Sequence, residues 1–128
     1  MAKILLIDDD PQILELLQEL LTQAGHECVC AENGVHGFRA LERGPIDLVV
    51  TDLIMPEAEG IETIMRIRGS GRSMPILAIS GGIPKLPGSH LPAAARLGAN
   101  RTLRKPFELA EFLRIVEELL ALPAAESR

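Results

Sequence analysis

Acidic side chains that could bind a metal ion follow two of the short apolar runs in this chain. Residues 8–10 are three consecutive aspartates directly after the run 4–7, and Asp52 follows the run 48–51. Carboxylates held close together repel one another, so the arrangement is costly unless a hard cation with oxygen ligands lies among them. Mg²⁺ is the natural candidate for such a set of ligands.

A hydroxyl and a lysine follow two later strand candidates. Ser80 comes after the run 76–79, and Lys105 comes after the segment 100–104. Carboxylates, Mg²⁺, a lysine and a hydroxyl can together hold a transferring phosphoryl group, because the positive charges neutralise its equatorial oxygens while one carboxylate attacks in line. Asp52 is placed to be that nucleophile.

These residues need a scaffold that brings them to one place. Five short apolar runs rich in β-branched residues alternate with segments of helical period, which is typical of an α/β fold with a parallel sheet covered on both faces. Right-handed crossovers then bring the carboxyl ends of the strands to one edge, where ligands bind. The expected strands are 3–7, 27–31, 48–51, 76–79 and 100–104, and the expected helices are 11–24, 33–41, 58–68, 89–97 and 107–120.

Local signals mark both ends of the first expected helix. Asp10 can cap free backbone amides, Pro11 has the backbone angle of a first helical residue, and Gly25 can end the helix. Cys28 and Cys30, the only cysteines, alternate within a strand at a spacing that suits no ordinary metal site. We therefore predict that both are buried, reduced thiols.

Charge and hydropathy exclude several classes of function. The formal net charge is −5, whereas a nucleic-acid-binding face needs clustered lysine and arginine, so direct binding of nucleic acid is not expected. The apolar run 4–7 is far too short for a signal-peptide core or a membrane span. We expect a cytoplasmic protein that does not enter a membrane.

Four motifs, in order along the chain, carry a resemblance to a known family. They are Ile4–Pro11, Asp47–Pro56 followed by Gly60, Ser80-Gly81, and Lys105-Pro106-Phe107. With these motifs the chain resembles the response-regulator receiver domain over nearly its whole length. The resemblance implies a flavodoxin-like, doubly wound sheet with strand order 2-1-3-4-5. It also implies that residues 1–128 form a single receiver domain, with no output domain in this chain.

The resemblance assigns a metal and an acceptor to the acidic residues. Asp52 resembles the phospho-acceptor, which also binds Mg²⁺, and Asp9 resembles a direct Mg²⁺ ligand. Asp8 resembles a ligand that acts through water, and the backbone carbonyl of Ile54 would complete the set. Asp10 matches no ligand and is interpreted as the helix cap.

The resemblance also assigns the lysine and the hydroxyl. Lys105 would contact the phosphoryl oxygens, with a cis peptide bond to Pro106, and Ser80 would move toward the phosphate. Thr102 stands where receivers usually carry an aromatic ring that rotates inward on activation. Residues 81–88 look longer than the common loop, so we expect this loop to be the main moving part.

The function implied is signalling rather than enzymatic. A histidine kinase or histidine phosphotransfer protein would supply the phosphoryl group from a phosphohistidine, with Mg²⁺ required, and the domain would assist its own phosphoryl transfer and dephosphorylation. The switch would act on an unknown downstream protein through the region 81–105. A homodimer through the expected helix 89–97, the strand 100–104 and the last helix stays open.

Three alternatives were weighed against this interpretation. A haloacid-dehalogenase-type phosphatase usually needs a second aspartate two residues after the nucleophile, where this chain has Ile54. The sequence also shows no extra cap segment that would select a substrate. A flavin carrier needs a hydroxyl-rich loop after its first strand to hold phosphate, and here that loop is acidic. A receiver that no longer accepts phosphate stays open.

Overall fold

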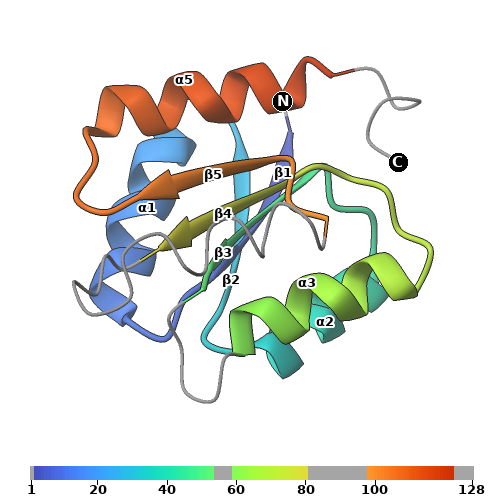
Figure 1. The fold of residues 1–128 in the computed structure, drawn as a ribbon. Helices are drawn as coiled ribbons and strands as arrows, with labels where there is room; N and C mark the ends of the chain where they lie inside the picture. The colour runs from blue at the N-terminus through green and yellow to red at the C-terminus, as the bar shows by residue number, and fades with distance from the viewer. Residues whose placement is uncertain (1, 54–58, 81–97, 123–128) are drawn as a thin grey trace.

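The chain forms one parallel five-stranded sheet with the strand order β2-β1-β3-β4-β5 (Figure 1). The structure is a computed structural model that describes residues 2–53, 59–80 and 98–122. The strands are β1 Lys3–Ile7, β2 Glu27–Ala31, β3 Leu48–Asp52, β4 Ile76–Ser80 and β5 Arg101–Arg104. The predicted α/β fold class and strand order are both confirmed.

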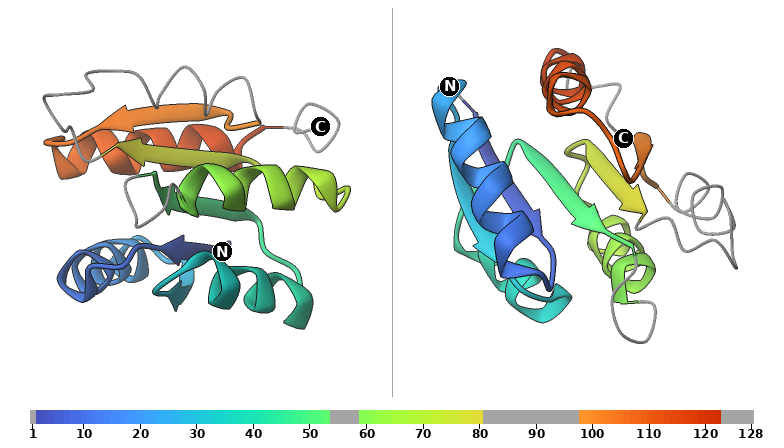
Figure 2. Two further views of the ribbon diagram at one scale, coloured as in Figure 1. Left: turned by 60° about the horizontal axis from the view of Figure 1, so that its bottom comes forward. Right: turned by 90° about the vertical axis from the view of Figure 1, so that its left-hand side faces the viewer.

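The described helices cover the sheet on both faces. They are α1 Pro11–Gln23, α2 Gly34–Arg43, α3 Glu59–Gly69 and α5 Leu109–Leu120. Figures 1 and 2 show α2 and α3 together on one face of the sheet, with α1 and α5 on the other. The predicted loop 81–88 and helix 89–97 lie outside the described residues. Within the described ranges, no helix is long and apolar enough to cross a membrane.

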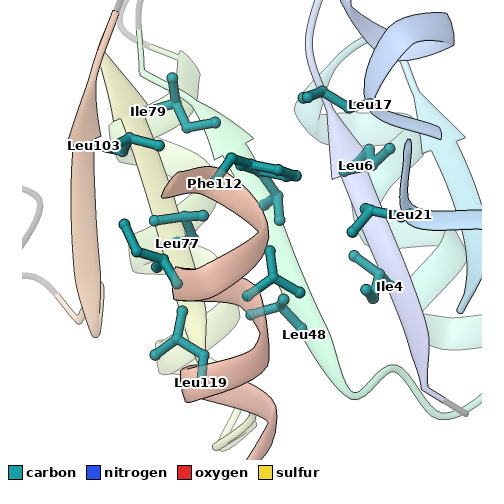
Figure 3. Packing of buried hydrophobic residues seen from close by; sticks show 13 residues of the cluster. Ile4, Leu6, Leu17, Leu21, Leu48, Leu77, Ile79, Leu103, Phe112 and Leu119 are labelled. Carbon is teal, nitrogen blue, oxygen red and sulfur yellow. The ribbon is translucent and has the colours of Figure 1, made fainter. Parts of the chain in front are cut away.

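The central strands are buried on both faces and hold the core together. Every residue of β3 and β4 is buried, as expected for parallel strands covered by helices on both sides. Figure 3 shows Phe112 of α5 among the side chains of the cluster on the α1 and α5 face. The Phe112 ring is fully buried and lies 5.8 Å from the Phe107 ring, measured between ring centroids. This packing fixes α5, and the segment before it, against the sheet.

The residues at the two ends of α1 act as the sequence predicts. Asp10 has an extended backbone and its side chain accepts a hydrogen bond from the Gln12 backbone N–H at 2.9 Å. Pro11 is the first helical residue, and Gly25 follows the helix with φ of +96°. That value lies in the left-handed region, which glycine adopts at little cost. The start and end of α1 are therefore set by local chemistry.

Two helix ends differ from the prediction by two residues. α2 continues past the predicted end at residue 41 to Arg43, because its last residues are exposed polar side chains that a helix tolerates, and Gly44 is the cap that follows it. α5 begins at Leu109 rather than at Phe107. Phe107 instead lies in the turn after the cis Lys105-Pro106 peptide bond, where its ring can stack on Phe112. Apolar periodicity included this ring in the helix because it contacts the same core.

The prediction that both cysteines are buried is wrong for Cys30. Both thiols are free, but Cys28 is only half-buried and Cys30 is exposed. The reason is the position of β2, which forms the edge of the sheet and therefore has a neighbouring strand on one side only. An apolar run indicates a strand, but it does not indicate whether that strand lies at the centre or at the edge.

The burial of Phe112 leads to a stability prediction. Phe112→Ala removes a fully buried ring and leaves a cavity between α5 and the sheet, so we expect the free energy of unfolding to fall by about 3–5 kcal/mol. Met65→Ala on α3 is the control, since Met65 is 51% exposed and its loss should cost less than about 0.5 kcal/mol. Urea unfolding of both variants measures the difference. Equal losses would show that α5 does not stabilise the core.

Candidate functional site

The sheet register brings the predicted site residues to one edge. Ile7 pairs with Thr51, so Asp8 follows β1 beside Asp52 at the end of β3. Asp52 in turn pairs with Ile79, and the next residue, Ser80, ends β4. These polar side chains therefore lie at the carboxyl ends of adjacent strands, the edge where parallel α/β sheets bind ligands.

Three carboxylates meet at this edge. One carboxylate oxygen from each of Asp8, Asp9 and Asp52 lies within 4.8 Å of the other two. Asp8 is 6% exposed and Asp52 is 5% exposed, whereas Asp9 is open to solvent. Oxygen ligands at this separation, some buried and one accessible, match what a hard divalent cation requires. The sequence predicted all three of these residues.

Lys105 lies between the two buried carboxylates. Its Nζ atom is 3.7 Å from Asp8 Oδ2 and 3.7 Å from Asp52 Oδ2. Its backbone N–H also donates to the Ser80 carbonyl at 2.9 Å, which continues the β4–β5 ladder and fixes the start of the lysine side chain. The lysine thus offsets part of the repulsion and offers an ammonium group at the centre of the site.

Burial disfavours the charged form of Asp8. Removal from water raises the pKa of the Asp8 carboxyl, and the charges of Asp9 and Asp10 act in the same direction. The Asp10 backbone N–H, which donates to Asp8 Oδ1 at 2.9 Å, and the Lys105 ammonium both oppose this rise. The pKa rises because the effect of burial outweighs the Asp10 N–H and the Lys105 ammonium. A divalent cation is the chemistry that fits the remaining charge.

Ser80 completes the row of strand ends. Its side chain is 6% exposed and belongs to β4, between Asp52 on β3 and Lys105 after β5. The cis peptide bond predicted between Lys105 and Pro106 is present. Thr102 is half-buried on β5 and pairs with Ala78. The fourth predicted metal ligand, the carbonyl of Ile54, lies outside the described residues.

Sequence reasoning missed two backbone features that shape the site. It assigned Asp10 only as a helix cap, whereas the Asp10 amide also orients the Asp8 carboxylate. It included Gly60 in a motif but assigned this glycine no structural role. A Cβ on Gly60 would lie 2.6 Å from the Leu53 Cα and even closer to the Asp52 carbonyl, so only glycine lets α3 approach the end of β3. A glycine inside a helical pattern was the available signal for this close approach.

The sheet and its edge define a class of domain. A five-stranded parallel sheet of order 2-1-3-4-5 with carboxylates and a lysine at its carboxyl edge is a flavodoxin-like domain equipped for a cation and an anionic group. The sequence profile of the response regulator receiver domain matches residues 4–117. The chain belongs to this family, whose members are phospho-accepting signalling domains of two-component systems.

Sequence relatives are longer proteins. The chain is 34% identical over 131 residues to the transcriptional regulatory protein GlrR of Escherichia coli K12, an alignment that covers 99% of this chain and 28% of that protein. It is 34% identical over 125 residues to CusR of the same strain, covering 96% of this chain and 53% of CusR. The chain therefore spans only about a quarter to a half of the length of these relatives.

Solved structures share the fold over almost the whole chain. The HemR receiver domain of Leptospira biflexa superposes with a TM-score of 0.85 at 28% identity, covering 96% of this chain and 97% of that one. TrrA of Thermotoga maritima, solved in complex with Mg²⁺ and BeF, superposes with a TM-score of 0.79 at 32% identity. That alignment covers 93% of this chain and 99% of TrrA.

The raised pKa of Asp8 predicts a stabilising substitution. Since the pKa of Asp8 is higher in the folded state than in the unfolded state, the ionised carboxylate costs stability above both values; the cost begins to fall as pH drops below the folded value and is gone below the unfolded value. Asp8→Asn should therefore unfold at higher urea than wild type at neutral pH without divalent cations. The difference should vanish in acid.

Asp10→Asn is the matched control for this comparison. Asparagine caps a helix as well as aspartate does, and the Asp10 charge is the smallest of the causes that raise the pKa of Asp8, so this variant should gain less stability than Asp8→Asn at neutral pH. A destabilised Asp8→Asn variant at neutral pH would mean that the contacts of ionised Asp8 with Lys105 and the Asp10 amide outweigh the effect of burial.

The close approach at Gly60 gives a second prediction. Gly60→Ala should lower the free energy of unfolding by about 1–3 kcal/mol, because the added methyl group must push α3 away from the end of β3. Gly69→Ala, in the same helix, meets nothing within 4 Å and should leave stability unchanged or slightly higher. Urea unfolding measures stability, and amide resonances of Asp52 and Leu53 report the displacement. Unshifted resonances in Gly60→Ala would contradict the proposed contact.

Proposed function

We propose that this domain accepts a phosphoryl group on Asp52 from a phosphohistidine, in a reaction that needs Mg²⁺. The observation that carries the proposal is the shared position of the two buried carboxylates, with Lys105 Nζ 3.7 Å from both Asp8 and Asp52. A nucleophilic carboxylate, an ammonium group and a cation site then lie together at one strand edge. The donor is a histidine kinase or a histidine phosphotransfer protein.

The three carboxylates form the protein's part of the cation site. Asp9 and Asp52 are the direct ligands of Mg²⁺, Asp8 acts through water, and the backbone carbonyl of Ile54 completes the set. The bound ion supplies positive charge to the phosphoryl oxygens and so lowers the barrier to transfer. Support comes from the spacing of the carboxylates and from TrrA, a 32% identical protein solved with Mg²⁺ and BeF.

The residues of the chain then carry out the transfer. An Asp52 carboxylate oxygen attacks phosphorus as the bond to the donor imidazole nitrogen breaks, and the electron pair of that bond stays on the imidazole. Lys105 moves its ion pair from the carboxylates to the phosphoryl oxygens, where its charge is needed. Ser80, at the end of β4, donates its hydroxyl to the same oxygens. Hydrolysis of the Asp52 acyl phosphate returns the domain to its first state, assisted by the same residues.

The phosphorylated domain acts on a partner rather than on a substrate. The region 81–105, which follows Ser80 and ends at Lys105, carries the change to a downstream protein in the cytoplasm. Thr102 replaces the usual aromatic ring and cannot exchange a large apolar surface, so the region 81–88 carries more of the signal. Self-association through the region 89–97, β5 and α5 is a further proposal for the phosphorylated state.

Acetyl phosphate tests the acceptor directly. Incubation of the domain with acetyl phosphate and Mg²⁺ should add the mass of one phosphoryl group to wild type and none to Asp52→Asn. Removal of Mg²⁺ with a chelator should reduce labelling, and Asp9→Asn should raise the Mg²⁺ concentration that labelling requires. Lys105→Ala should slow labelling by about 100-fold or more, the usual cost of losing one charge that stabilises a transition state.

Asp10→Asn is the control for these variants. It neutralises a neighbouring aspartate that matches no ligand and keeps a capping oxygen, so its labelling should equal that of wild type. Loss of the label over time, followed by mass, measures dephosphorylation. Absence of labelling in folded wild-type protein, with acetyl phosphate and with a phosphorylated histidine kinase, would show a receiver that no longer accepts phosphate.

A further inference from the structure

The two edges of the sheet differ in their protection against pairing with another strand. β5 forms one edge and carries Arg101 and Arg104, and Arg101 also forms an ion pair with Glu118 at 2.7 Å. Charged side chains on an edge strand oppose the addition of further strands. β2 forms the other edge with the sequence ECVCA, in which Glu27, at the start of the strand, is the only charged residue and no proline occurs. Among the described residues, β2 pairs only with β1.

The outward-facing backbone groups of β2 belong to Cys28 and Cys30. The Ala31 carbonyl accepts the Asp8 backbone N–H at 3.1 Å, so residue 31 and the alternate residues 29 and 27 bond toward β1. In a parallel pair the residues between them direct their N–H and C=O groups to the opposite side. Cys28 and Cys30 therefore offer two donors and two acceptors to an added strand.

A groove of ≈ 380 Å³ runs along this edge. Leu14 of α1 and residues 29–31 of β2 form part of its lining, and α2 forms much of the remainder with three basic side chains, His36, Arg39 and Arg43. Glu32 is the only acidic residue in the lining. None of the three basic side chains forms an ion pair with any other residue that the structure describes. The groove is thus basic on a protein whose formal net charge is −5.

The spacing of the two arginines matches that of alternate residues in a strand. Arg39 and Arg43 are four residues apart in α2, or about 6 Å along the helix axis. Alternate side chains on one face of a strand are about 6.6 Å apart. Two acidic side chains at alternate positions of an added strand would therefore each meet one arginine.

The opposite face of an added strand meets a different surface. Cys28 packs in the cluster on the α1 and α5 face, and Leu14 of α1 lines the groove on that side. These thiol and aliphatic groups favour apolar side chains on that face of the added strand. We infer that the β2 edge is a docking site for an extended segment of a partner protein in which acidic and apolar residues alternate. The backbone of that segment pairs with Cys28 and Cys30, and its acidic residues pair with Arg39 and Arg43.

A second copy of this chain fits the edge less well. Two β2 strands that pair antiparallel about a two-fold axis through Val29 form one continuous sheet, and both α2 helices then lie on the same face. Arg39 and Arg43 of one copy would lie beside the same residues of the other. Like charges placed together oppose association, so the charge of the groove favours an acidic partner.

Amide hydrogen exchange with a designed peptide tests the inference. The probe is an acetylated and amidated peptide of alternating glutamate and valine, about seven residues long. With free peptide at about ten times its dissociation constant, the exchange of the Cys28 and Cys30 amides should slow about tenfold. The amides of Val29 and Ala31 already bond to β1 and should change little. Slowing at all four positions alike, or at none, would overturn the proposal.

Two matched comparisons separate charge from backbone pairing. The double variant Arg39→Glu, Arg43→Glu should bind the peptide at least about tenfold more weakly, whereas Arg114→Glu, an exposed arginine of α5, should bind like wild type. A peptide methylated on alternate backbone nitrogens keeps its charges and should not bind. Undiminished binding by this peptide or by the folded double variant would overturn the proposal. So would protection of Cys28 and Cys30 that rises with protein concentration in the absence of peptide, which would identify a second copy as the occupant.

Discussion

The concentration of negative charge at one end of an apolar sheet is the constraint on which the rest of the structure depends. Two of the three carboxylates are more than nine-tenths buried, so neither can be screened by water as a surface group would be. Charge of the same sign in such a place needs partners held at fixed positions. Lys105 and the Asp10 amide provide them, and both are attached to backbone that the sheet or the first helix holds in place.

The apolar interior supplies the rigidity that this arrangement requires. β3 and β4 are buried throughout, and α5 packs its fully buried Phe112 against the same face of the sheet as α1. A slip of β3 by one residue would move Asp52 to the opposite face and exchange the side chains that pack in the two cores, Val49 in one and Leu48 and Val50 in the other. On the α3 side, the missing side chain of Gly60 lets the helix lie directly against the Asp52 backbone. The packing of the apolar core and of α3 therefore sets the distances between the charged groups at the sheet edge.

Much of this could be predicted from the sequence, for a physical reason. Buried parallel strands are short apolar runs, and each must end where its polar groups can reach solvent or a ligand, so Asp52, Ser80 and Lys105 mark the strand ends themselves. The strand order came from the family resemblance, because an apolar run does not encode which strand lies beside it. For the same reason the exposure of Cys30 on an edge strand was missed.

What the sequence could not provide were contacts between backbone atoms. The amide of Asp10 reaches the Asp8 carboxylate only because the turn into α1 closes back on β1, and the need for glycine at position 60 appears only when α3 is packed on the sheet. Phe107 was placed in the last helix because its ring contacts the same core as Phe112, although its backbone lies before the helix. Side-chain periodicity reports which groups are buried, not which backbone conformation buries them.

The incomplete compensation of Asp8 ties the stability of the domain to its ionic surroundings. The three carboxylates come together only in the folded chain, so an ion that binds them binds the native state and not the unfolded one. By mass action, such an ion raises the free energy of unfolding by an amount that grows with the logarithm of its free concentration once the site is nearly full. An ion bound by these carboxylates would thus also make the folded population of the domain depend on the supply of divalent cations.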